Sequence, residues 1–154
     1  MAGALIELDL RQIADISAVL ARYERLLAAP GPLLDDIGQH LVNTTDERFD
    51  QREGPDGTPW QPVSGRYARR KEAGRATKRS GAVTDPGKVL ELTRDLRRLI
   101  RHQVVGDELQ VGSDRPYAAT HQFGRGGIPA RPFLGVSPED EREIGRIALH
   151  YLQL

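Results

Sequence analysis

HQVVGDELQV, residues 102–111, carries the clearest local structural signal in this chain. Two short runs containing valine and leucine flank Gly106-Asp107, and such a pair is typical of a tight two-residue β-turn. We therefore expect two antiparallel strands here. Because most other apolar residues follow helical spacing, the predicted class is α+β: a small, mostly antiparallel sheet packed against several helices.

Two helices are expected on the N-terminal side of this hairpin, because apolar side chains recur there every three or four positions. The first spans residues 11–29 and stops at Pro30-Gly31, and the second continues to about Asp50. So short a turn between them predicts that they pack antiparallel. Residues 4–10 alternate between apolar and acidic side chains, which predicts a half-buried strand. The apolar stripes are Ile13, Ile16, Leu20, Tyr23 and Leu27 in the first helix, and Leu34, Ile37, Leu41 and Phe49 in the second.

Shorter helices are expected along the rest of the chain. Residues 64–73 predict a basic helix capped by Ser64. Leucines at positions 92, 96 and 99 predict a helix for which Thr93 is the N-cap, and residues 116–123 predict another. A last helix opens at Ser137-Pro138, where a serine cap, a proline and several acids follow one another.

The connecting segments contain one turn and one long loop. Pro55-Asp56-Gly57 is a turn sequence, and Trp60 directly after it is expected to anchor the segment to the core. Residues 74–88 are glycine-rich, basic and nearly free of large apolar groups, so they predict a long mobile loop. With this loop, residues 1–154 are long enough for a single domain.

Composition excludes several classes of protein. The chain has no Cys, which excludes disulfides, thiolate metal sites and Cys nucleophiles. No apolar run approaches the roughly 18 residues of a membrane-spanning helix, and the N-terminal residues lack the basic region of a signal peptide. Because 22 basic residues balance 22 acidic ones, the whole surface is not an electrostatic clamp for nucleic acid or membrane. We expect a soluble protein made in a reducing cytoplasm.

Catalytic and ligand-binding patterns are missing from the sequence. The histidines at positions 40, 102, 121 and 150 form no metal-binding pair, and His121, the one candidate base, has no nucleophile beside it. The segment Gly81–Lys88 has the wrong spacing for a phosphate loop, and no Ser stands in a G-x-S-x-G elbow. We therefore predict a protein that is not an enzyme and that holds no cofactor and no metal.

Charge is distributed unevenly along the chain. Residues 1–63 carry five basic and eleven acidic side chains, a net charge of −6. Residues 64–101 carry twelve basic and four acidic ones, a net charge of +8, and residues 102–154 carry five and seven, a net charge of −2. This layout suits an assembly in which the basic stretch of one copy meets an acidic surface of the next, although a solvated basic loop would have the same composition.

The basic segment 66–79 is the main candidate for contact with a partner. It could bind another subunit, or it could make the protein a nucleic-acid-binding adaptor, since a strip of Arg and Lys neutralises phosphates. Only Tyr67 could stack on a base, so nucleic acid is not expected to be the main partner. The interface candidates in this segment are Arg69, Arg70, Lys71, Lys78 and Arg79.

Several short motifs in a fixed order resemble the phage virion morphogenesis family, also called tail-completion proteins. The resemblance covers roughly residues 30–154. Its most specific parts are YAATHQFG (residues 117–124) and IPARPFLG (residues 128–135), followed by the turn DGTPW (residues 56–60). The other motifs are Arg48-Phe49, Tyr67-Ala68-Arg69-Arg70-Lys71, Leu90-Glu91-Leu92-Thr93 and Val111-Gly112-Ser113.

This resemblance implies a structural protein of the virion tail or neck. Such proteins look like components that complete or terminate the tail tube and allow it to join a filled head. Related neck and tail-terminator proteins form rings, commonly hexameric, with a small sheet, flanking helices and a long mobile loop. The implied partners are other copies of the chain, the tail tube, further neck or connector proteins and possibly the sheath, with no membrane. The place of synthesis would be the cytoplasm of a bacterial host.

Two kinds of role are predicted for residues within these motifs. Tyr117, His121 and Phe123 are expected to pack the short helix onto the sheet. Arg131 lies before a proline that fixes the direction of the chain, so we expect a bidentate contact with a carboxylate, either in the C-terminal helix or in a neighbouring subunit. The full set of residues expected to support the fold is Trp60, Tyr117, His121, Phe123, Pro132 and Phe133.

Overall fold

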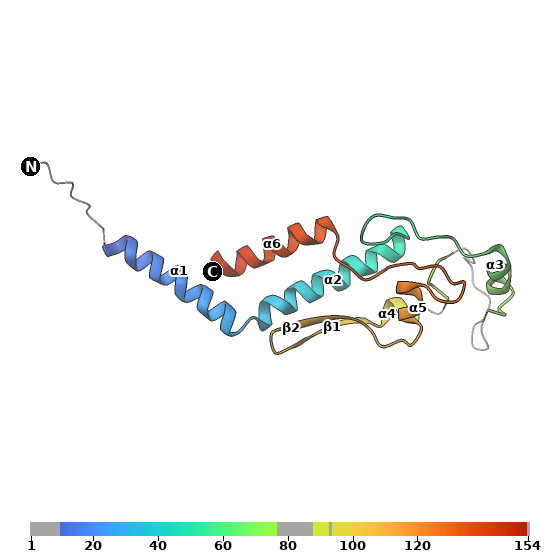
Figure 1. The fold of residues 1–154 in the computed structure, drawn as a ribbon, viewed down its shortest axis with the longest axis horizontal. Coiled ribbons are helices and arrows are strands. Elements are labelled where there is room, and N and C mark those ends of the chain that lie inside the picture. The colour runs from blue at the N-terminus through green and yellow to red at the C-terminus, as the bar shows by residue number, and fades with distance from the viewer. Residues whose placement is uncertain (1–9, 77–87, 93, 154) are drawn as a thin grey trace, which may run out of the picture.

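The computed structural model describes residues 10–76, 88–92 and 94–153, and for residues 10–16 and 153 only the backbone (Figure 1). Six helices and one two-stranded antiparallel sheet lie in these ranges, which confirms the α+β class. Residues 4–9 of the predicted N-terminal strand lie outside them, and Leu10 begins a helix. The elements are α1 (Leu10–Ala28), α2 (Gly31–Gln51), α3 (Gly65–Glu72), α4 (Asp95–Arg98), β1 (Ile100–Val105), β2 (Glu108–Ser113), α5 (Ala118–Phe123) and α6 (Pro138–Gln153).

The predicted hairpin is confirmed. β1 and β2 pair antiparallel with Val105 opposite Glu108, so Gly106 and Asp107 form a two-residue turn. Gly106 has a φ of 65°, a conformation that glycine adopts without a steric penalty. This register places one face of the hairpin toward α2.

α2 is the central element of the molecule. The hairpin runs along one side of it and α6 along the other (Figure 1). Gly38 allows the close approach of the hairpin, because a Cβ at this position would lie only 2.6 Å from His102 Cγ and 2.8 Å from Leu109 Cδ1. On the other side, the Tyr151 hydroxyl of α6 donates to Asp36 at 2.6 Å.

The hydrophobic core lies at the C-terminal end of α2. Phe49 packs edge-on against Trp60, with ring centroids 5.3 Å apart, and lies 5.8 Å from Phe133. Trp60 Nε1 donates to the Pro132 carbonyl at 2.8 Å, so the indole N–H is satisfied although the ring is buried. The predicted role of Trp60 as an anchor is confirmed. The other buried apolar residues of this cluster are Val89, Leu96, Ile100 and Ala118.

One expectation about the helices is wrong, and another is confirmed only in a shorter form. α1 does not fold back on α2: the two helices diverge from the turn at Pro30-Gly31, and the end of α1 near the turn contacts α6 instead (Figure 1). The helix expected from the leucines at positions 92, 96 and 99 is present as a single turn, α4, which begins only after Arg94 because Arg94 has a left-handed φ of 61° that a helix does not allow. Its expected cap, Thr93, lies outside the described residues.

None of the helices in the described part of the chain is long and apolar enough to cross a bilayer.

Candidate assembly surfaces and the buried network behind them

Arg48 and Asp140 form a buried ion pair between α2 and α6. Arg48 is 5% exposed and Asp140 is 1% exposed, and Arg48 Nη2 donates to Asp140 Oδ2. Arg48 Nη1 also donates to the carbonyls of Phe133 and Gly135, at 3.2 and 2.9 Å. A buried guanidinium is thus matched by one carboxylate and two carbonyls, as burial of a charge requires.

Asp140 also caps the first turn of α6. Its Oδ2 accepts from the backbone N–H and the hydroxyl of Ser137, both at 2.8 Å, while the Asp140 N–H donates to Ser137 Oγ at 3.1 Å. Its Oδ1 lies 2.9 Å from His40 Nε2. Burial by itself would raise the pKa of Asp140, but these Ser137 contacts and the charge of Arg48 outweigh it and lower the pKa. The carboxylate therefore stays ionised as the acceptor for Arg48.

Arg131 does not contact a carboxylate among the described residues, so the expected ion pair with the C-terminal helix of the same subunit is wrong. Its side chain is 6% exposed, and Nε and Nη2 donate to the carbonyls of Gln61 and Pro62 at 2.7 and 3.2 Å. Arg131 thus fastens the segment after Trp60 to the motif 128–135. The arginine that reaches an acid of the C-terminal helix is Arg48. The sequence could have identified Arg48 as a buried arginine, because it stands next to Phe49, a residue of the apolar stripe of α2.

Arg97 holds a second charged cluster that the sequence analysis missed. Its guanidinium contacts Asp46 at 2.5 Å and Asp50 at 2.7 Å, both on α2, and Glu91 at 3.3 Å. The hydrogen bonds that Arg97 donates to these two aspartates, which lie one helical turn apart, raise the pKa of Arg97. The Glu91 side chain is 1% exposed and also pairs with Lys88 at 3.2 Å. The cluster therefore fixes the segment around α4 to α2.

The basic candidates of α3 divide into two groups. Arg69 and Arg70 are exposed and available to a partner. Lys71 is buried and its Nζ donates to the Lys88 carbonyl at 2.6 Å, so it is wrong as an interface residue. Successive helical residues point about 100° apart, which separates Lys71 from its neighbours. The candidates Lys78 and Arg79 lie outside the described residues, as do positions 77–87 of the expected loop.

α5 does not bury the aromatic residues that were expected to pack it. Tyr117 is 41% exposed and Phe123 is 77% exposed, so the prediction is wrong for both. The helix is held instead by Ala118, which is buried, and by Gln122. Gln122 Oε1 accepts from the N–H groups of Phe133 and Leu134, both at 3.0 Å, and Nε2 donates to the Leu134 carbonyl at 2.9 Å.

His121 is partly buried at the back of α5. Its carbonyl accepts from the Arg131 N–H at 2.7 Å, and its ring lies edge-on to Tyr117 at 6.0 Å. Burial, together with the charge of Arg131, lowers the pKa of His121 and favours the neutral ring. Its Nδ1 is buried without a hydrogen-bond partner in the described structure. Phe133 is fully buried and Pro132 supplies the carbonyl for Trp60, so both support the fold.

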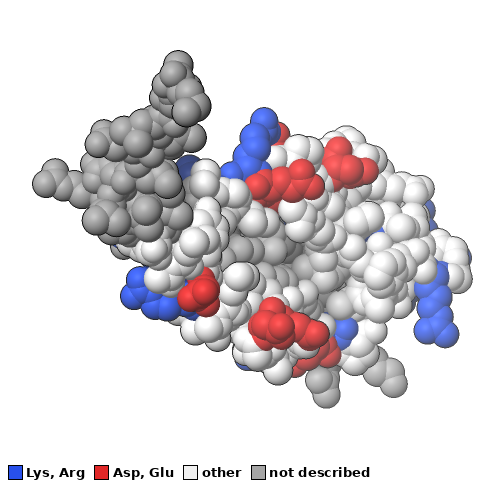
Figure 2. Space-filling model, turned by 60° about the vertical axis from the view of Figure 1, so that its left-hand side comes forward, with Lys and Arg blue, Asp and Glu red and all other residues white. Residues whose placement is uncertain are grey.

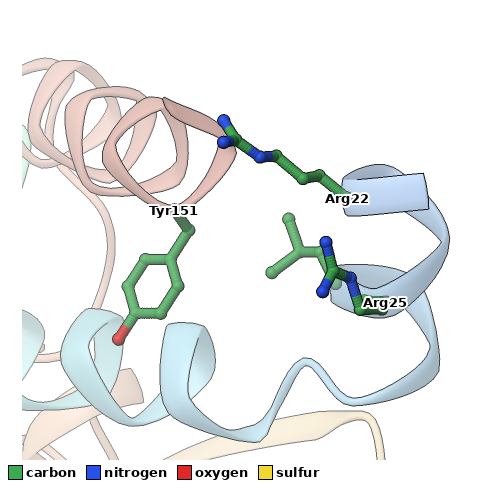
Figure 3. Close-up of a pocket in the computed structure, with 4 residues that line it drawn as sticks. Arg22, Arg25 and Tyr151 are labelled. Carbon is green, nitrogen blue, oxygen red and sulfur yellow. The ribbon is translucent and has the colours of Figure 1, made fainter. Parts of the chain in front are cut away.

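The apolar stripe of α1 faces solvent. On α1, Leu20 is 57% exposed and Leu27 is 79% exposed, and Val19 and Tyr23 on the same face are about half exposed. The adjacent side of the helix is the attached one: Arg22 Nη1 donates to the Leu152 carbonyl at 3.5 Å. Figure 3 shows Arg22 reaching from α1 toward the end of α6, while Tyr151 points away from it toward α2.

The face drawn in Figure 2 carries charges of both signs and no large patch of a single sign. In Figure 2, small groups of acidic side chains alternate with basic ones and are separated by uncharged surface. In the described ranges no three His, Asp or Glu residues are placed to hold a metal ion. A shallow pocket lined by Asp46, Asp50, Lys88, Arg94, Arg97 and Arg98 coincides with the Arg97 cluster. Asp46 and Asp50 pair with Arg97, while Lys88 and Arg94 pair with Glu91, so most charges of this pocket already have partners within the fold.

The sequence is similar to proteins of phages and prophages. A family model described as the phage virion morphogenesis family matches residues 8–153. Mu-like prophage FluMu G protein 2 of Haemophilus influenzae is 31% identical over 157 residues, which cover 97% of this chain and 98% of that protein. A protein of Escherichia phage Mu named "Putative capsid assembly protein G" is 32% identical over 114 residues, 68% of this chain and 67% of its own. No solved structure matches the chain.

Proposed function

We propose a role at the head–tail interface for this protein, which belongs to the phage virion morphogenesis family. Membership supports a structural or assembly role in making the phage particle. Within that role, the protein completes or terminates the tail tube as a homo-oligomeric ring and enables the tail to join the head. It acts without catalysis, through its surfaces.

The observation that carries this proposal is the solvent-facing stripe of α1. A helix whose large apolar side chains point into water is stabilised when another protein surface covers them. The body of the subunit supports the same role, because Arg48 and Arg97 tie α2 to the segments around it through buried or partly buried charges. Such a subunit combines a fold held together by internal ion pairs with exposed surfaces to which a partner can bind.

Removal of the gene from the phage or prophage that carries it tests the proposal. We expect electron micrographs to show filled heads and separate tails, with joining restored by the gene supplied in trans. Gold-labelled antibody against a tagged copy should mark the head-proximal end of the tail. Normal virions without the gene, or label confined to another part of the particle, would contradict the proposal.

Nucleic-acid binding through residues 66–79 is the competing function. Burial of Lys71 takes one cation out of that strip. Two results together would favour the adaptor instead. The first is a steep loss of DNA affinity with salt that disappears in the Arg69→Ala/Arg70→Ala variant. The second is normal joining of heads and tails in the strain from which the gene has been removed.

A further inference from the structure

Two exposed apolar patches lie far apart on this subunit. The α1 stripe consists of Val19, Leu20, Tyr23 and Leu27. The α5 patch consists of Phe123, at the C-terminal end of α5, and Ile128 in the turn that follows it. Figure 1 places α1 at one end of the long axis and α5 toward the other. One molecule therefore cannot bring its own two patches together.

The α5 patch is held in position by the fold. Ala118 and Gln122 attach the inner side of α5, which leaves Phe123 pointing outward. Arg125 and Ile128 close a tight turn through reciprocal backbone hydrogen bonds of 3.1 and 2.9 Å. A patch that is already ordered loses little conformational entropy when a partner covers it.

Charges beside the two patches are of opposite sign. Glu24 is exposed and lies on the same side of α1 as Leu20 and Leu27, which are four residues before it and three after it. Arg125 is exposed between Phe123 and Ile128 in the sequence. Neither charge makes an ion pair inside the described part of the subunit. Each could therefore meet the other across an interface, where complementary charges fix the register.

We propose that the α1 stripe of one copy packs on the α5 patch of the next copy, with Glu24 beside Arg125. The contact joins two different surfaces, so it is heterologous, and repeating it generates a ring when the rotation closes. The inference deepens the proposed function, since it names the surfaces from which the ring would be built.

The exposed area is adequate for a specific contact. Full burial of an aromatic side chain covers about 150–250 Å², so the six exposed side chains of the two patches offer roughly 100 Å² each. Non-obligate interfaces are about 57% apolar, which brings the whole contact to roughly 1,000 Å², the area that a specific contact should reach. Pairing of two α1 stripes with each other would bury a similar area, but it would leave the α5 patch in water.

Cross-linking tests this pairing directly, because the natural chain has no Cys. Leu27→Cys protein is mixed with Phe123→Cys protein and treated with a short bismaleimide, both at high protein concentration and on isolated tails. We expect a dimer only in the mixture, and a ladder ending in a closed species for the double variant. Leu27→Cys mixed with Val105→Cys, at the exposed hairpin tip, is the matched control and should give no product.

Three results would overturn the inference: a dimer of equal yield from Leu27→Cys alone, equal yield from the Val105→Cys control, or no product in either preparation. The outcome is independent of the position of the protein in the virion. Failure of the cross-link with label still at the tail end removes this interface and leaves the proposed function. A specific cross-link, together with normal virions in the strain that lacks the gene, would support this interface and remove the proposed function.

Charge reversal gives a second test, because a variant that had merely unfolded would not regain affinity when its partner residue is reversed as well. We expect Glu24→Arg and Arg125→Glu each to weaken association several-fold, since a rim ion pair contributes modestly. The double reversal should restore the affinity. Association by the double variant that is no stronger than that of the weaker single variant would contradict the pairing of these two residues.

Discussion

Replacing Asp140 with asparagine removes the negative charge from the buried network and nearly preserves its shape. Arg48 would remain buried with only two carbonyl partners. Breaking a buried ion pair by removing one member costs about 3–5 kcal/mol, and the two remaining carbonyls place this case near the lower value. In a chain of this length, a loss of about 3 kcal/mol lowers the melting temperature by roughly 6–12 °C.

Urea unfolding followed by fluorescence measures this loss, because the one Trp of the chain, Trp60, is buried in the core. Glu139→Gln is the matched control. Glu139 lies in the same turn of α6, but its side chain is 74% exposed, and we expect a change within about 0.5 kcal/mol. A free energy of unfolding for Asp140→Asn that lies within 1 kcal/mol of the value for the control would refute the reasoning, since urea unfolding resolves a difference of that size.

A double variant separates the ion pair from the helix cap. Arg48→Met removes the cation that Asp140→Asn leaves without a carboxylate, so the two changes together should cost less than their sum. Directly coupled residues show interaction energies of about 0.5–3 kcal/mol. Strict additivity would mean that the cost of Asp140→Asn comes from the lost cap at Ser137.

The same carboxyl predicts a pH dependence. Although burial opposes it, the hydrogen bonds from Ser137 and the charge of Arg48 keep the pKa of Asp140 below its ordinary value of 3.8. A group with a lowered folded pKa stabilises the protein above its unfolded pKa, and that contribution is lost as the pH falls from about 5 through the unfolded value. Wild-type protein should therefore lose more stability than Asp140→Asn between about pH 5 and 3. Equal losses would contradict the assignment.

Three further predictions follow from burial and close packing. Phe133→Ala should cost about 3–5 kcal/mol in urea unfolding, whereas Phe123→Ala should change the monomer by less than about 0.5 kcal/mol. Gly38→Ala should cost about 1–3 kcal/mol, because its Cβ would collide with the hairpin, while Gly145→Ala in open space on α6 should stabilise by about 0.5–1 kcal/mol. Burial lowers the pKa of His121 in the folded protein. The neutral ring therefore contributes to the stability of the fold above the unfolded pKa of about 6.5, and this contribution is lost as the pH falls below that value. His121→Phe should flatten the stability profile from about pH 7 to 5 in the same assay, and unchanged slopes would count against it.

Elements with strong local signals could be predicted from the sequence. The turn at Gly106-Asp107, the cap at Ser64 and the Ser137-Pro138 start of α6 each depend on neighbouring residues alone, and the structure confirms all three. The lone Trp60 was also predictable as an anchor, since a buried indole has few alternatives near a turn. The turn and the two helix starts are local features, so they needed no knowledge of the rest of the chain.

Long-range features were not predictable in the same way. Helical spacing identified the stripe of α1 but gave no information on whether a neighbour covers it. Phe123 has the residue type of a core position, yet the short helix α5 docks through Gln122 on its other side. Proline beside Arg131 suggested a fixed direction, but the choice between a carboxylate and carbonyls depends on which segment, here Gln61, lies opposite.

The partners of Arg48 also set a condition on when the protein can fold. The three partners of Arg48 described above lie between Phe133 and Asp140, more than 80 positions after Arg48 in the sequence. During synthesis, α2 therefore emerges from the ribosome long before anything can neutralise the cation on its buried face. Contacts of such sequence separation slow folding, since a long loop must close before they form. We expect α2 to dock only when nearly the whole chain has been translated, so fragments that stop before α6 should be substrates for proteases and chaperones.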